Sequence, residues 1–99
     1  MDTYQDTISV KKVSKLGKLV TIELTYSQKS MVIRAIKITG DFFLHPEETI
    51  EKLEESLAGV KLEKENIRNK IESALKNSQF YGFDVDSLCN AILECVKER

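Results

Sequence analysis

The side chains that could take part in chemistry are few, and their spacing does not suit catalysis. His45 is the one histidine, so a metal site or a proton relay built from several histidines is excluded, and its position before Pro46 is typical of a surface or capping residue. Cys89 and Cys95 lack the Cys-x-x-Cys spacing of zinc and redox sites. Six positions on a helix turn one side chain about 600° from the other, so the two thiols cannot share a metal or form a bond within that helix. We expect both cysteines in the core.

The acidic pairs offer no acid–base machinery. Glu47-Glu48 and Glu54-Glu55 are neighbours on a predicted helix, so the carboxylates of each pair diverge instead of converging on a substrate. The sequence also lacks a phosphate-binding loop, a dinucleotide-binding glycine fingerprint, a nucleophile elbow and a His-Glu-x-x-His motif. We therefore expect no catalytic residue and no bound metal. We expect a domain that acts through contact with a partner.

Length and charge support this interpretation. A chain of 99 residues, 41% apolar, can bury one core but has little volume left for an enclosed active site. Residues 10–37 carry seven bases and one acid, whereas residues 41–65 carry eight acids and three lysines. Such polarity can orient a partner, and two solvated faces would explain it as well. The basic segment lacks interleaved aromatic residues, so nucleic-acid binding is not expected.

The sequence gives no indication of export or membrane insertion. No apolar run approaches the roughly 20 residues that cross a bilayer, and the N-terminus has no apolar signal-peptide core. Two cysteines are too few for a disulfide framework. We expect a reduced, soluble, cytoplasmic protein that does not contact a membrane.

The elements that must position these residues are strands in the first half of the chain. Residues 19–26 alternate apolar and polar side chains, which predicts a half-buried strand. The polar residues 27–30 predict a hairpin loop, and residues 31–39 predict the return strand. Residues 7–10 alternate weakly and could add a third strand, followed by a basic stretch to Gly17.

The return strand has an imperfect phase. Ile36 and Ile38 share a face that Ile33 does not. A bulge near Arg34-Ala35 would bring all three isoleucines to one face.

Helical periodicity begins after the strands. Pro46 suits the first helical position, with Glu47 and Glu48 in the first turn, and Gly59 is placed to end this helix in the left-handed conformation. Its apolar stripe consists of Ile50, Leu53 and Leu57.

Two further helices are expected. One covers residues 63–76, a loop with aromatic anchors follows over residues 77–83, and Asp84 is expected to cap the last helix. The predicted stripes are Ile67, Ile71, Ala74 and Leu75 in the first and Val85, Leu88, Ile92 and Val96 in the second, the latter flanked by Cys89 and Cys95.

Strands followed by helices predict an α+β fold, with a small antiparallel sheet of two to three strands and three helices packed on one face. We expect a single domain over residues 1–99. Residues 1–16 are extended or partly strand, residues 17–43 form a β-hairpin and a corner, and residues 46–99 form the helical part.

The corner is the sequence Gly40-Asp41-Phe42-Phe43, between the last strand and the first helix. In one interpretation both phenylalanines fill the core and Asp41 binds backbone N–H groups in the turn. In the other, one phenylalanine is exposed as an anchor for another protein.

The corner also carries a family resemblance. The run from Ile33 to Phe43, followed by Pro46-Glu47-Glu48, Ile50, Leu53-Glu54, Leu57 and Gly59, resembles the C-terminal accessory domain of lipoate–protein ligases. The resemblance covers roughly residues 17–59 and continues loosely through the later helices. The glycine-rich lipoate-binding motif and the lysine of the ligases' catalytic domain have no counterpart, and the chain starts at its own Met1.

The resemblance implies a free-standing, non-catalytic accessory subunit that forms a heterodimer with a separate catalytic subunit. Such ligases use ATP to convert lipoate to lipoyl-AMP and then modify a lysine of an acyl-carrier lipoyl domain. ATP, Mg and lipoate would bind the catalytic subunit, and none would bind this chain alone. The accessory part would act chiefly in activation, by helping to close and order the catalytic site.

The residues carried over as partner-interface or site-closing candidates are Gly40, Asp41, Phe42, Phe43 and Lys18. We expect the sheet half and the corner to face the catalytic subunit, with Lys18 directed toward phosphates or complementing an acidic patch. Two alternatives remain. One is a sulfur-handling or iron–sulfur scaffold-like protein, which needs exposed cysteines in loops near the sheet. The other is a protein-binding module unrelated to lipoylation.

Overall fold

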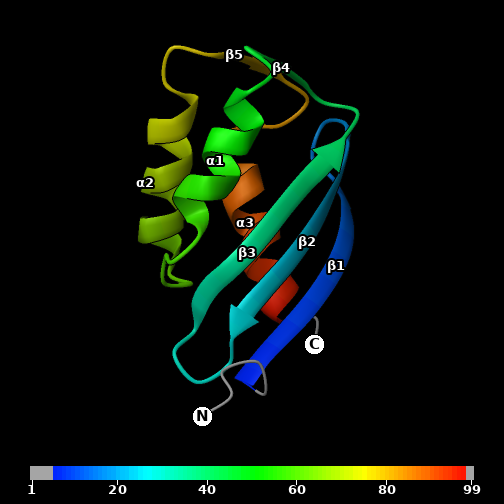
Figure 1. Ribbon diagram of the computed structural model, residues 1–99. Coiled ribbons are helices and arrows are strands. Elements are labelled where there is room, and N and C mark those ends of the chain that lie inside the picture. The colour runs from blue at the N-terminus through cyan, green and yellow to red at the C-terminus, as the bar shows by residue number, and fades with distance from the viewer. Residues whose placement is uncertain (1–5, 98–99) are drawn as a thin grey trace.

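One layer of the protein is a three-stranded antiparallel sheet, and the other layer is helical. The computed structural model describes residues 6–97. The sheet contains β1 (Thr7–Lys15), β2 (Leu19–Ser27) and β3 (Val32–Gly40) in the order β1-β2-β3. Three helices follow within the described residues, α1 (Thr49–Leu57), α2 (Lys64–Leu75) and α3 (Val85–Lys97). They lie on one side of the sheet, where α1 packs on β3, α3 packs on β1 and β2, and α2 packs on the other two helices (Figure 1). The expected α+β class is confirmed.

The central strand β2 organises the core. Its alternate residues Val20, Ile22, Leu24 and Tyr26 are at most 1% exposed. The expected bulge is present in β3, because the pairing passes from Thr25–Ala35 to Tyr26–Ile33 and leaves Arg34 without a partner on β2. The extra residue lets Ile33, Ile36 and Ile38 all lie buried on the core side.

The third strand is present and is longer than expected. All nine residues of β1 pair with β2, from Thr7 opposite Ser27 to Lys15 opposite Leu19. The basic stretch therefore belongs largely to the strand, because alternation leaves Lys11 and Lys15 exposed while their backbones pair. Of residues 1–16, expected to be extended, residues 1–5 lie outside the described part of the chain.

The first helix starts later than predicted. Pro46 precedes the helix by a turn, in which the Thr49 N–H donates to the Pro46 carbonyl at 3.0 Å and the Ile50 N–H donates to the Glu47 carbonyl at 3.3 Å. These bonds span three residues, so the chain turns more tightly here than an α-helix does. Leu53 and Leu57 are buried as expected, whereas Ile50 is half-buried and Thr49 joins the buried face. Gly59 has the expected positive φ, +87°.

The later helices match their predicted stripes closely. Ile67, Ile71 and Leu75 of α2 are buried, and Ala74 is half-buried. The Ser87 N–H donates to Asp84 Oδ1 at 2.7 Å, which confirms the cap of α3. The buried face of α3 is wider than the stripe, since this helix contacts β1, β2 and α2. It comprises Leu88, Cys89, Ala91, Ile92 and Cys95, with Val85 and Val96 half-buried.

One expectation for residues 77–83 is wrong. These residues are not only a loop, because β5 (Gln79–Tyr81) pairs antiparallel with β4 (Phe43–His45) in a second, two-stranded sheet. Three-residue strands show almost no readable alternation, and the two partners are far apart in the chain. A strand between α2 and α3 therefore pairs with the strand that begins at the end of the corner.

Backbone N–H and C=O groups on the outer edge of β3 form hydrogen bonds with a loop and with a side chain of α1. The Ile33 N–H donates to the Val60 carbonyl at 2.9 Å, and the Gly59 N–H donates to the Ile33 carbonyl at 2.7 Å. Further along the strand, the Ile38 N–H donates to Glu54 Oε2 at 2.8 Å. The Glu54 carboxylate on α1 thus accepts a hydrogen bond from a strand N–H that would otherwise lack a protein partner.

We expect Glu54→Ala to lower the free energy of unfolding by about 1–2 kcal/mol, because it removes a charged acceptor from a part-buried N–H. The neighbouring exposed Glu55→Ala serves as the control and should change stability by less than about 0.5 kcal/mol. Urea denaturation measures both variants. Equal losses in the two would show that the contact to Ile38 is not stabilising.

Candidate functional site

The corner lies against the turn between β1 and β2. The Asp41 N–H donates to the Leu19 carbonyl at 3.0 Å. The Lys18 N–H donates to the Gly82 carbonyl at 2.9 Å. The structure therefore brings Lys18 and the corner together at one end of the protein, where β4 and β5 also lie (Figure 1).

Two glycines permit this close packing. Gly40 has φ +149°, and a Cβ there would lie 2.3 Å from the Leu19 carbonyl oxygen. Gly82 has φ +108°, and its Cβ would lie 3.0 Å from both Lys18 Cγ and Phe42 Cα. Only glycine fits without a shift of the backbone. Gly40 is thus structural, and Gly82 was missed because its partners are distant in sequence.

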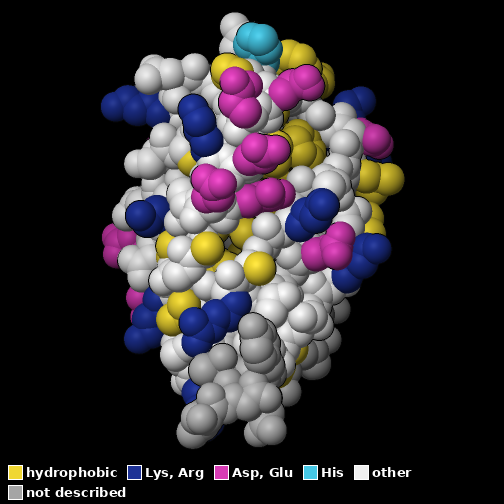
Figure 2. Space-filling model, viewed as in Figure 1, with side chains coloured by type: hydrophobic (Ala, Val, Ile, Leu, Met, Phe, Trp, Pro, Cys, Tyr) yellow, Lys and Arg dark blue, Asp and Glu magenta, His cyan; other side chains and the backbone are white. Residues whose placement is uncertain are grey.

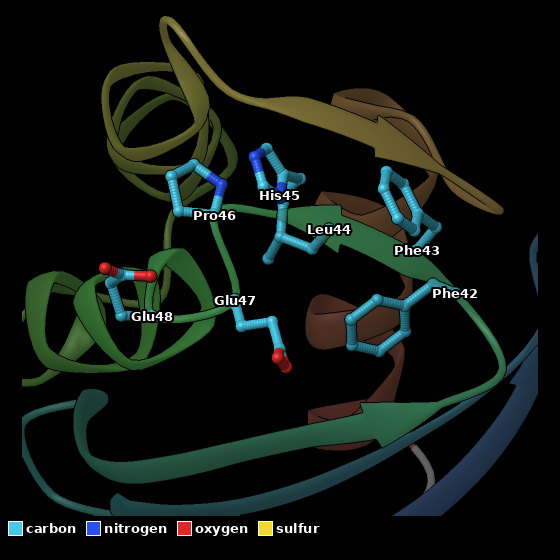
Figure 3. Close-up of a pocket in the computed structure, with 7 residues that line it drawn as sticks. All are labelled: Phe42, Phe43, Leu44, His45, Pro46, Glu47 and Glu48. Carbon is cyan, nitrogen blue, oxygen red and sulfur yellow. The ribbon is translucent and has the colours of Figure 1, made fainter.

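The two phenylalanines of the corner have different environments. Phe42 is half-buried, and its ring meets Phe83 edge to face at a centroid distance of 5.3 Å. Phe43 is 55% exposed. Their rings point to opposite sides of the backbone (Figure 3). Phe42 is therefore a core residue, and Phe43 is available to a partner.

Asp41 does not play the turn role considered for it. Its side chain is exposed, and its carboxylate accepts no hydrogen bond from any residue in the described range. The backbone of this residue closes the turn instead, since its own N–H reaches the Leu19 carbonyl. The carboxylate is left facing solvent.

The outer face of the β4–β5 pair is aromatic. Phe43 lies directly opposite Tyr81, which is 69% exposed, and His45 lies opposite Gln79. The rings of Phe43 and His45 are stacked, with centroids 6.4 Å apart and an interplanar angle of 7°. Leu44 occupies the inner face. Tyr81 was not among the candidates, and the aromatic cluster in residues 77–83 was the signal that could have found it.

Two open hollows border this aromatic face. One, of about 610 Å³, is lined by residues 42–48 (Figure 3). The carboxylate of Glu47 points away from the His45 imidazole in this view, so the two do not form an acid–base pair. The other hollow, of about 330 Å³, is lined by Lys18, Tyr81 and neighbouring residues. Neither hollow brings together the groups of a catalytic centre.

The structure offers no metal or thiol site in the described range. Among residues 6–97 no group of three or more His, Cys, Asp or Glu side chains could hold a metal ion. Cys89 and Cys95 form no disulfide and are fully buried, and burial raises the pKa of the Cys89 thiol. A raised pKa lowers the thiolate fraction, so this side chain behaves as a small core residue. No helix of the described chain is long and apolar enough to cross a membrane.

We expect Gly40→Ala to lower the free energy of unfolding by about 3 kcal/mol, because the new methyl group meets the Leu19 carbonyl at an unfavourable φ. Gly59→Ala is the matched control, since Gly59 also has a positive φ but nothing lies within 4 Å of its added Cβ. The control should cost about 1 kcal/mol. Chemical denaturation compares the two, and equal costs would contradict the close approach.

Comparisons with known proteins point in one direction. The family described as bacterial lipoate protein ligase C-terminus matches residues 7–92. Among solved structures, the chain resembles one from Thermoplasma acidophilum, described as a bi-partite lipoate protein ligase and its E2 lipoyl domain. That match has a TM-score of 0.76 and 26% identity, and it covers 87% of this chain and 96% of the other. A search of curated protein sequences finds no match.

Proposed function

Because this chain belongs to the family of bacterial lipoate protein ligase C-terminal domains, we propose that it is the non-catalytic accessory subunit of an ATP-dependent lipoate–protein ligase. The family match over residues 7–92 is the observation that carries the proposal. The Thermoplasma chain adds support, since the match covers 96% of its length. A bipartite ligase is thus a precedent for this fold as a separate chain.

The proposed reaction has two steps, both on the catalytic subunit. The lipoate carboxylate first attacks the α-phosphate of ATP, forming lipoyl-AMP and releasing pyrophosphate. The acyl group then passes to a lysine amine of a lipoyl domain, releasing AMP. ATP, Mg and lipoate all bind the catalytic subunit, and the cytoplasm is the compartment we propose.

This chain contributes to the first step without chemistry of its own. By docking on the catalytic subunit it favours a closed, water-excluding state in which the adenylate forms and is protected from hydrolysis. The lack of converging acid–base groups around the two hollows fits such a role.

The five candidate residues take two different parts in this proposal. Gly40 and Phe42 shape the corner from within, because one permits the close backbone approach and the other packs against Phe83. Asp41, Phe43 and Lys18 expose their side chains and are the ones that a catalytic subunit can contact.

No observation favours the sulfur-handling alternative. That role requires accessible thiols near the sheet, and both cysteines are buried in α3. A protein-binding module unrelated to lipoylation would leave lipoate activation by any ligase unchanged, which makes it an outcome of the following test.

We expect pyrophosphate release from ATP and lipoate to require both the candidate catalytic subunit and this chain. With both present, release should rise at least tenfold over the catalytic subunit alone, about 1.4 kcal/mol of barrier. Omission of lipoate and heat-denatured accessory chain are the controls. Unchanged release, with no complex on a sizing column, would refute the accessory role.

A further inference from the structure

The exposed large apolar side chains gather at one end of the protein. In the part of the chain that the structure describes they are Val13, Leu19, Phe43 and Tyr81, between 51% and 69% exposed. Val13 and Leu19 lie on the sheet face away from the helices, toward the turn between β1 and β2. Phe43 and Tyr81 lie on the outer face of the β4–β5 pair. We call these four residues the apolar patch.

Strand pairing and backbone hydrogen bonds join the segments that carry the four residues of the apolar patch. Val13 faces Thr21, so it is the diagonal cross-strand neighbour of Leu19. Leu19 is hydrogen-bonded to Asp41, two residues before Phe43. Lys18 is hydrogen-bonded to Gly82, next to Tyr81, and Phe43 and Tyr81 are directly paired. A partner that covers one half of the patch therefore lies close to the other half.

Basic side chains predominate around the patch, although two exposed acids also lie beside it, Glu23 opposite Lys11 and Asp41 two residues before Phe43. Lys15 lies opposite Leu19, and Lys11 lies two residues from Val13 on the same strand face. Lys18 precedes Leu19 and lines a hollow together with Tyr81. All three lysines are exposed. Acidic side chains gather instead over the region of α1, as Figure 2 shows. The exposed acids of α1 and of the turn before it are Glu47, Glu48, Glu51 and Glu55. A complementary partner surface is thus apolar with an acidic border.

We propose that the apolar patch is the surface that docks on the catalytic subunit, which presents an apolar area bordered by acids; this inference rests on the proposed function. A second copy of this chain does not fit that description. The acids that gather over α1 lie beside the buried leucines Leu53 and Leu57, and none of the four exposed large apolar side chains belongs to that helix. Phe43 and Tyr81 form the centre of the contact, since rigid aromatic side chains carry most of the binding energy in interfaces of this kind.

Calorimetry with the 99-residue chain and the catalytic subunit tests the docking surface. Tyr81→Ala and Phe43→Ala should each weaken binding about 30-fold. Leu19→Ser, a side chain outside the aromatic pair, should weaken binding about tenfold and serves if an aromatic variant fails to fold. Lys18→Glu should weaken binding about tenfold and reduce its salt dependence. Lys70→Glu on α2 is the matched control and should bind like the unaltered chain.

Each outcome separates the docking surface from the function. If the unaltered chain binds and stimulates pyrophosphate release but folded patch variants bind equally well, the docking surface is wrong and the accessory role stands. If the unaltered chain neither binds nor stimulates, the proposed function fails. A chain that dimerises alone and loses dimerisation in Tyr81→Ala would assign the patch to a second copy and overturn the proposal.

Discussion

The close approach of Gly40 to the backbone of Leu19 determines how the end of the protein that carries the corner is built. Without a Cβ at Gly40, the end of β3 lies against the start of β2, and the Asp41 N–H reaches the Leu19 carbonyl. The chain then leaves the sheet in a direction that turns Phe42 into the core and Phe43 outward. It also places β4 where β5 can pair with it. Gly82 has a similar effect, because the lack of a Cβ lets Lys18 and Phe42 both approach its backbone.

This arrangement gives a small protein a rigid exposed surface. The apolar patch is carried by strands whose backbones are paired and whose inner faces pack on one core. A contact surface held in this way loses little conformational entropy on docking, so more of the contact energy appears as affinity. Such a surface suits a subunit whose contribution is to stabilise one state of a larger partner.

Sequence reasoning succeeded where the signal was local. The alternation of residues 19–26, the bulge at Arg34 and the cap at Asp84 each depend on near neighbours, and the structure confirms them. It failed where distant segments decide. The position of Tyr81 depends on the pairing of β5 with β4, which are separated in the chain by two helices. The role of Asp41 depends on a hydrogen bond from its backbone N–H to the Leu19 carbonyl on β2. The start of α1 was misplaced because Pro46 fits a preceding tight turn as well as a first helical position.

Amide hydrogen exchange of this chain, with and without the catalytic subunit, tests most directly that one end of the molecule is the functional surface. We expect slower exchange in peptides covering residues 16–19, 40–43 and 79–82, and unchanged exchange across α2. Slowing confined to α1 or α2, in a complex that releases pyrophosphate, would contradict it.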